Sequence, residues 1–177
     1  NINFTYFKRI GRYLTMAKPN RIDQLIEENI SEDRTILALK DKYIGLRGSM
    51  EFATKPTLST LKVLVYSGNQ CMDEGAEAIA GSPYLENLET LNINHNEIGD
   101  DGAIALANSK NLPKLSSLSM FGNVVGDVGA QAFADSPESK KYLKLDLYKN
   151  QFGKAGIRAL NESANLKNCE ELEYYTE

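Results

Sequence analysis

The sequence of 177 residues contains one histidine (His95), two cysteines (Cys71 and Cys169) and no tryptophan. So few ligands, placed so far apart, do not give the spacing of a metal site, which gathers several His and Cys side chains. The separation of the two cysteines argues against a disulfide between them, and reduced thiols fit a reducing compartment. We therefore expect no metal, no cofactor and a cytoplasmic location.

The sequence also lacks long apolar runs and an excess of positive charge. No stretch approaches the roughly 20 apolar residues that span a bilayer, and the start shows neither a methionine nor a signal peptide. The missing methionine suggests a piece of a longer chain. With 20 Lys and Arg against 24 Asp and Glu, the net charge of −4 argues against nonspecific binding to nucleic acid. We expect no membrane segment and no nucleic-acid partner.

A repeat of 27 residues organises most of the sequence. The segment 88–107, LETLNINHNEIGDDGAIALA, combines an alternating pair, Leu91 and Ile93, with a turn at Asn96 and a short helical pattern. The same residue types return every 27 positions in four columns: Leu64, Leu91, Leu118 and Leu145; Asn69, Asn96, Asn123 and Asn150; Gly75, Gly102, Gly129 and Gly156; Ala78, Ala105, Ala132 and Ala159. This period predicts a solenoid whose stacked units share one core.

Each unit should form a short strand followed by a helix. Alternation places Leu91 and Ile93 on one face of a strand, and the helix returns the chain so that the next strand runs parallel. We expect five or six parallel strands with one open face, about four outer helices, and right-handed crossovers.

The other columns predict contacts that stabilise the turns and the helix ends of each repeat. The Asn amides should bond backbone groups of adjacent turns, and Asp73, Asp100 and Asp127 should cap the helices they precede. Lys154 replaces this Asp, so its helix should start less firmly. The Gly column should allow helix and strand layers to approach closely. Ser82, Ser109, Ser136 and Ser163 follow the helix ends, where they favour turns.

Residues 1–33 do not follow the repeat. Their spacing predicts two short amphipathic helices, one carrying Phe4, Phe7, Ile10 and Leu14 and one over residues 21–30. We interpret 1–33 as a helical N-terminal cap; a targeting or recruitment module is the alternative. Residues 34–177 then form the solenoid, with a degenerate first repeat, four full repeats and a final partial one.

With these motifs the chain resembles leucine-rich-repeat proteins of the ribonuclease-inhibitor type over residues 34–177. The pattern LxxLxLxxNxIxDxGAxxLA is matched by Leu88, Leu91, Ile93, Asn96, Ile98, Asp100, Gly102, Ala103 and Leu106. The resemblance implies an α/β right-handed solenoid, or horseshoe, with a parallel sheet on the concave side and helices outside. The IGDDGA variant is also similar to bacterial members, including effectors of intracellular bacteria.

The open face of the sheet is the predicted recognition surface, because its positions vary from repeat to repeat. An aromatic column of Phe121, Tyr148 and Tyr175 lies near His95 and should anchor a partner; support of the sheet by cross-strand packing is the alternative. A charged rim should orient the partner. The predicted partner-binding residues are Thr90, Asn92, Asn94, His95, Ser117, Ser119, Phe121, Lys144, Asp146, Tyr148, Lys149 and Tyr175.

Catalysis has little support in the sequence. His95, Ser119 and Asp146 could mimic a triad, but adjacent strands bring many polar pairs together by default. We therefore expect a monomeric protein–protein interaction module that is not an enzyme. The resemblance extends this to a bacterial effector that is secreted into a host cytoplasm and acts on a host protein. The alternative is a regulator of a small GTPase, because Ran GTPase-activating proteins share the repeat class.

Overall fold

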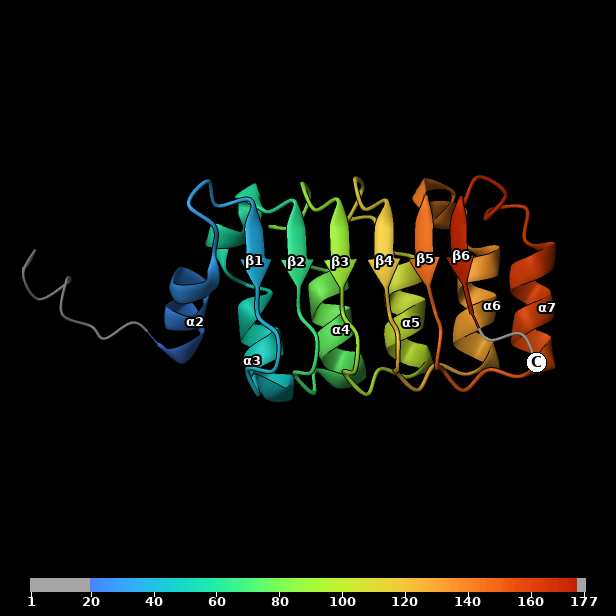
Figure 1. The fold of residues 1–177 in the computed structure, drawn as a ribbon, viewed down its shortest axis with the longest axis horizontal. Coiled ribbons are helices and arrows are strands. Elements are labelled where there is room, and N and C mark those ends of the chain that lie inside the picture. The colour runs from blue at the N-terminus through green and yellow to red at the C-terminus, as the bar shows by residue number, and fades with distance from the viewer. Residues whose placement is uncertain (1–19, 175–177) are drawn as a thin grey trace, which may run out of the picture.

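The computed structural model describes residues 20–174 as two layers, a parallel sheet and a row of helices behind it (Figure 1). The six strands are β1 (Ile36–Ala38), β2 (Val63–Val65), β3 (Thr90–Asn92), β4 (Ser117–Ser119), β5 (Lys144–Asp146) and β6 (Glu171–Glu173). The helices are α2 (Arg21–Asn29), α3 (Gly45–Phe52), α4 (Met72–Ala80), α5 (Asp100–Ala107), α6 (Asp127–Asp135) and α7 (Lys154–Glu162), with 3-10 turns η1 (Pro56–Thr60) and η2 (Pro137–Lys141). Strand order follows the sequence from β1 to β6.

The pairing register reproduces the 27-residue period. Leu91 in β3 pairs with Leu64 in β2 and with Leu118 in β4, and all three side chains are buried. The residues on either side, such as Thr90 and Asn92, are only half-buried and point to the open face. The prediction of parallel strands with one buried and one open face is confirmed. The degenerate first repeat also forms a complete strand and helix, β1 and α3.

The asparagine column forms the predicted ladder along the turns after the strands. Asn96 Oδ1 accepts hydrogen bonds from the backbone N–H groups of Asn69 at 3.0 Å and Cys71 at 3.3 Å. Its Nδ2 donates to the carbonyl oxygens of Tyr66 at 2.8 Å and Asn94 at 3.0 Å. Each Asn therefore satisfies backbone groups of its own and the preceding turn, which water cannot reach.

The aspartate column acts between repeats, contrary to our expectation. Helix α5 has Gly99 at its N-cap, and its own Asp100 lies inside the first turn. The carboxylate of Asp73 accepts instead from the N–H groups of Gly99 at 2.7 Å and Gly102 at 2.9 Å. The prediction that each Asp caps its own helix is therefore wrong, because the free N–H groups point toward the preceding repeat.

The same arrangement corrects the expectation for Lys154. Helix α7 begins at Lys154, but Asp127 accepts from the N–H groups of Gly153 at 2.7 Å and Gly156 at 2.8 Å. The start of α7 is thus bonded like the starts of α5 and α6. Lys154 occupies the position that would reach toward a following repeat.

The glycine column allows neighbouring helices to pack closely. A Cβ on Gly102 would lie 2.8 Å from Asp73 Oδ1 and 3.1 Å from the Cβ of Ala76, both in α4. It would also lie 2.6 Å from Cγ2 of Ile98, which precedes α5 in the same repeat. The close approach is therefore chiefly between adjacent helices, and not between helix and strand layers as expected.

The serine column closes the opposite helix ends. The hydroxyl of Ser136 donates to the carbonyl of Ala107, the last residue of α5, at 2.8 Å, and also accepts from the N–H of Glu138. The same hydroxyl-to-carbonyl bond joins Ser82 to Ala53, Ser109 to Ala80 and Ser163 to Ala134. The predicted turn role is present, and a bond to the preceding repeat is added to it.

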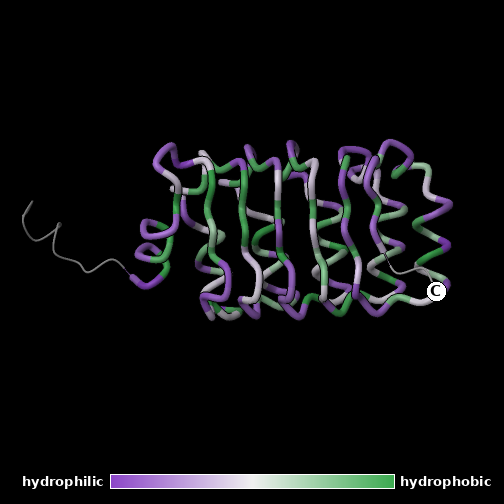
Figure 2. The backbone as a smooth tube through the Cα atoms, in the orientation of Figure 1, coloured by the Kyte–Doolittle hydropathy of each residue, from purple (hydrophilic) through white to green (hydrophobic). Residues whose placement is uncertain are grey.

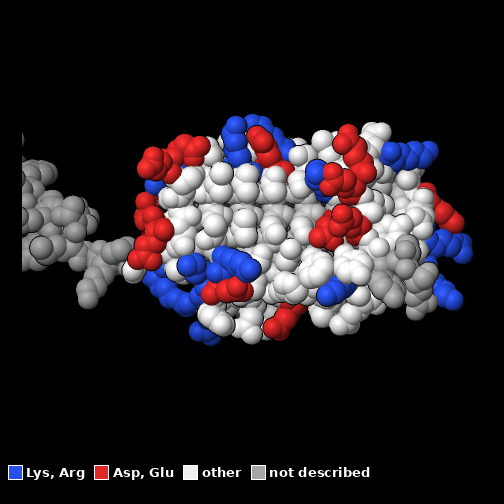
Figure 3. All heavy atoms as spheres, in the orientation of Figure 1, with Lys and Arg blue, Asp and Glu red and all other residues white. Residues whose placement is uncertain are grey.

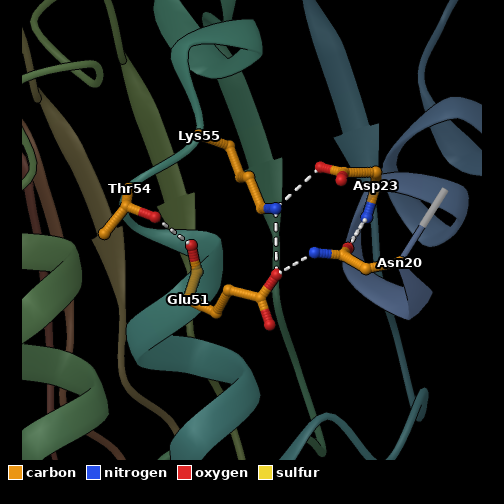
Figure 4. A network of polar contacts seen from close by, with 5 residues as sticks. All are labelled: Asn20, Asp23, Glu51, Thr54 and Lys55. Atoms are coloured by element: carbon orange, nitrogen blue, oxygen red, sulfur yellow. Dashed lines mark hydrogen bonds and ion pairs between the residues drawn. The ribbon is translucent and has the colours of Figure 1, made fainter. Parts of the chain in front are cut away.

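Helix α2 covers the first end of the core. Ile22 and Ile26 are buried against the first repeat, and Lys55 Nζ joins Asp23 of α2 at 2.8 Å to Glu51 of α3 at 2.9 Å (Figure 4). The second predicted N-terminal helix is confirmed. The first, with Phe4, Phe7, Ile10 and Leu14, lies outside the described residues. Within residues 20–174, no helix has the length and apolar character needed to cross a bilayer.

Candidate functional site

The open face of the sheet, which is seen in Figure 3, carries most of the predicted site residues. The register places Thr90, Ser117 and Lys144 in one row, and Asn92, Ser119 and Asp146 in the next. The ladder continues beyond the strands, because His95 N–H donates to the carbonyl of Phe121 at 3.0 Å and Gly122 N–H to that of Tyr148 at 3.0 Å. Tyr175, the last member of the predicted aromatic column, lies outside the described residues.

An aromatic cluster of His95, Phe121, Tyr148 and Lys149 extends across three repeats. The rings of Phe121 and Tyr148 stack with centroids 5.8 Å apart and planes at 22°. His95 meets Phe121 edge-on at 5.2 Å, and Lys149 Nζ lies 5.2 Å from the centre of the Phe121 ring. Phe121 and Tyr148 stay partly exposed. The cluster therefore combines cross-strand packing with aromatic surface open to a partner.

His95 lies against the backbone of the next repeat at Gly122, where an added side chain would force the His95 ring to shift. A Cβ on Gly122 would lie 2.5 Å from ring atoms of His95. His95 (φ 53°), Gly122 (φ 67°) and Lys149 (φ 55°) share a left-handed backbone conformation, as do Asp41 and Gly68 earlier in the column. This role of Gly122 was not among the predictions from the sequence. The signal was the alternation of glycine with larger residues along this column.

Polar side chains of the face hold the backbone under the aromatic rings. Asn94 Oδ1 accepts from the N–H of Phe121 at 2.8 Å, and Asp146 Oδ1 from the N–H of Tyr148 at 2.9 Å. The hydroxyl of Ser119 lies between them, 2.7 Å from Asn94 Oδ1 and 2.8 Å from Asp146 Oδ2. These residues were predicted to contact a partner; in the structure they position the backbone of the cluster.

The possible triad is not assembled in the described part of the chain. Ser119 shares its hydrogen with Asn94 and Asp146, whereas His95 packs against Phe121 and Gly122. A nucleophile must lie within hydrogen-bond reach of its base, and Ser119 and His95 do not form that pair. Among residues 20–174, no group of three His, Cys, Asp or Glu side chains is placed to hold a metal ion.

A hollow of about 200 Å³ opens beside the aromatic cluster on strands β4 to β6. Its charged lining consists of Lys144, Asp146, Glu171 and Glu173. Lys144 Nζ pairs with Glu171 Oε1 at 2.5 Å, and this hydrogen bond raises the pKa of Lys144. Both charges are about half exposed, so the pair contributes little to stability. Glu171 and Glu173 were not among the predicted site residues.

The opposite end of the face, on β1 and β2, is apolar. Ile36 is 46% exposed and pairs with Val63, and Ala38 pairs with Val65. Both valines are partly exposed. These apolar residues were not among the predicted site residues.

Two larger hollows lie on the helical side of the molecule. One of about 560 Å³ lies between α6 and α7 and includes Ser163; the other, of about 490 Å³, lies between α3 and α4 and includes Ser82. Both serines belong to the repeating serine column, so the hollows are equivalent grooves between successive helices. We interpret them as products of helix packing.

The comparisons with known proteins agree with this architecture. Residues 84–107 and 111–134 match a family model described as Leucine Rich repeat. No curated protein matches the chain. A solved structure described as "Leiomodin-1 Actin-Binding Site 2 (ABS2)" aligns with a TM-score of 0.63 and 20% sequence identity, and covers 82% of this chain and 91% of that chain. The predicted fold class, an α/β leucine-rich-repeat solenoid, is confirmed; at this identity the likeness concerns the fold alone.

Proposed function

We propose that this leucine-rich-repeat solenoid is a protein-binding module whose partner docks on the open face of the sheet, centred on Phe121 and Tyr148. The aromatic cluster is the observation that carries the proposal. Large aromatic side chains with few soft torsions are the residues that most often dominate binding energy at protein interfaces. Here two of them are stacked and partly exposed on a regular sheet.

The surroundings of the cluster favour binding because they fix its shape beforehand. Asn94 and Asp146 bond the backbone of Phe121 and Tyr148, and Gly122 gives His95 its place. A surface that is already ordered loses less conformational entropy on association. The leiomodin-1 structure, which shares the fold, is named as an actin-binding site; this also supports a protein as the kind of partner.

The resemblance to bacterial effectors extends the proposal to a host-cell protein as the partner. The alternative, a regulator of a small GTPase, predicts faster nucleotide hydrolysis when the protein is added to candidate GTPases. If the protein binds a GTPase without accelerating nucleotide hydrolysis, this alternative is excluded and the proposal of a binding module is retained.

Affinity capture tests the proposal. The native chain and a Phe121→Ala/Tyr148→Ala variant would be used as baits for bacterial and eukaryotic lysates, with bound proteins identified by mass spectrometry. Truncating two central aromatic anchors should weaken binding by roughly 100-fold or more. Tyr43→Ala is the matched control, because Tyr43 is 74% exposed but lies in the loop between β1 and α3.

The proposal requires a protein that binds the native chain and the Tyr43→Ala control but not the double variant. Circular dichroism and melting temperature must agree among the three chains, so that lost capture cannot result from unfolding. Equal capture by all three would show that the aromatic cluster only supports the sheet, and would contradict the proposal.

A further inference from the structure

The open face changes its chemistry from one end of the solenoid to the other. Hydrophobic residues follow β1 and β2 at one end (Figure 2), where Ile36, Val63 and Val65 are exposed or half exposed. Strands β3 and β4 present uncharged Thr, Asn and Ser side chains. Acidic groups gather over β5 and β6 at the other end (Figure 3). A partner that covers the face therefore meets three different surfaces in a fixed order.

Carboxylates outnumber cations in the lining of the hollow at the β5–β6 end. Asp146, Glu171 and Glu173 line the hollow together with one ammonium, that of Lys144, which is paired with Glu171. The side chains of Glu171 and Glu173 are exposed. A cation from a partner can therefore reach these carboxylates without the large desolvation cost of a deeply buried charge.

The neighbouring aromatic cluster already accommodates a cation. The Lys149 ammonium lies 5.2 Å from the centre of the Phe121 ring, the distance range of a cation–π contact. Phe121 stacks on Tyr148, and Tyr148 follows the hollow-lining Asp146 by two residues. A guanidinium or ammonium held between the hollow and the rings would meet carboxylates on one side and an aromatic surface on the other.

We infer that the partner presents basic side chains over β5 and β6 and apolar side chains over β1 and β2, on one segment laid across the strands. This inference rests on the proposed function and specifies the partner's chemistry. Opposite charge attracts and orients a partner, whereas an acidic segment would be repelled at this end. Five strand spacings correspond to about 24 Å, which a helix of roughly 16 residues covers.

A peptide selection tests the inference with defined probes. Random peptides of about 18 residues, long enough for such a helix, would be displayed on phage. They would be selected on the native protein after depletion on the Phe121→Ala/Tyr148→Ala variant. We expect enriched peptides to carry Lys and Arg in one half and apolar residues in the other. Their affinities would then be measured by fluorescence anisotropy at low and high salt.

Two double variants locate the two halves of the peptide, and a third serves as a control. Glu171→Gln/Glu173→Gln should weaken binding about fivefold at low salt and less at high salt, because exposed ion pairs are modest and screened. Glu74→Gln/Glu77→Gln removes the same charge from exposed positions of α4 on the helical side and should leave affinity within about twofold. Ile36→Ser/Val63→Ser should weaken the same peptides by removing apolar contact.

The outcomes separate this inference from the function on which it rests. Peptides that need Phe121 and Tyr148 but are acidic or uncharged, and bind equally after Glu171→Gln/Glu173→Gln, would overturn the partner chemistry and leave the docking face standing. A selection in which no peptide distinguishes the native protein from the Phe121→Ala/Tyr148→Ala variant would contradict both.

Discussion

The carboxylate of Asp100 accepts a hydrogen bond of 2.7 Å from the backbone N–H of Gly126, which belongs to the next repeat. The same oxygen accepts from Gly129 N–H at 2.8 Å, so one side chain in α5 satisfies two free donors at the start of α6. Asp73 and Asp127 make the equivalent bonds to the helices that follow them. The capping of α5, α6 and α7 is thus an interaction between repeats.

Asp100→Ala should lower the free energy of unfolding by about 1–2 kcal/mol, the usual cost of losing an N-cap side chain. Urea unfolding would measure the loss, with the exposed neighbour Asp101→Ala as a control expected to change stability by less than about 0.5 kcal/mol. Hydrogen exchange would show which helix has lost stability. Amides at the start of α6 should exchange faster, whereas faster exchange confined to α5 would show that Asp100 stabilises its own helix.

Gly122→Ala should disturb the aromatic cluster as well as the backbone. The new Cβ would meet the His95 ring at 2.5 Å, in addition to the strain of a left-handed φ. Gly45→Ala is the matched control, because Gly45 has φ 70° but nothing within 4 Å of an added Cβ. Backbone strain should lower the free energy of unfolding of both variants by about 1–2 kcal/mol. The loss should be larger for Gly122→Ala, because its Cβ also meets the His95 ring.

The NMR signals of the His95 imidazole provide a second measurement of this difference. The ring lies edge-on to Phe121 at 5.2 Å, so its chemical shifts include the ring current of Phe121. They should change in Gly122→Ala and stay constant in Gly45→Ala. Equal stability losses together with an unchanged imidazole signal would mean that Gly122 is not what positions His95.

Cys71 should make the protein less stable in alkaline solution. Burial raises the pKa of its thiol from 9.0 to about 12, so the thiol stays neutral in the folded state while it ionises in the unfolded state. Its contribution is fully present below pH 9 and is lost as pH rises toward 12, because the unfolded state then binds fewer protons. The loss approaches about 1.4 kcal/mol per pH unit.

A Cys71→Ala variant would isolate this effect from other alkaline transitions, including that of Tyr66, whose pKa burial also raises. Urea unfolding of both proteins between pH 8 and pH 11 would give the two slopes. The variant should be less stable at pH 8 because a buried side chain is truncated, but its stability should fall less steeply with pH. Identical slopes would show that Cys71 ionises equally in both states.

The periodic sequence was sufficient to predict the strands, the core columns and the asparagine ladder. The pairing register equals the repeat length, so residues 27 positions apart had to become neighbours, as Leu91 and Leu118 do. The direction of capping could not be predicted in this way. An Asp such as Asp100 lies at a fixed sequence distance both from its own helix and from the next helix. The repeat pattern is therefore compatible with capping of either helix.

The neighbourhood of two residues of the candidate site was predicted for the same reason. The register placed Phe121 beside Tyr148, and the rings stack as neighbours on adjacent repeats. The position of His95 over Gly122 depends on left-handed backbone angles at both residues, which no apolar pattern encodes. The hydroxyl of Ser119 hydrogen-bonds to Asn94 and Asp146. These partners depend on local geometry, which the repeat pattern does not specify.

The capping bonds also give the solenoid a direction during synthesis on a ribosome. When α5 emerges, the carboxylate of Asp73 is already present to start it. The carbonyl of Ala107 at its end must wait for the hydroxyl of Ser136, made 29 residues later. A growing chain that has reached the end of α5 therefore already contains the residue that caps the start of this helix, but not yet the residue that bonds its end.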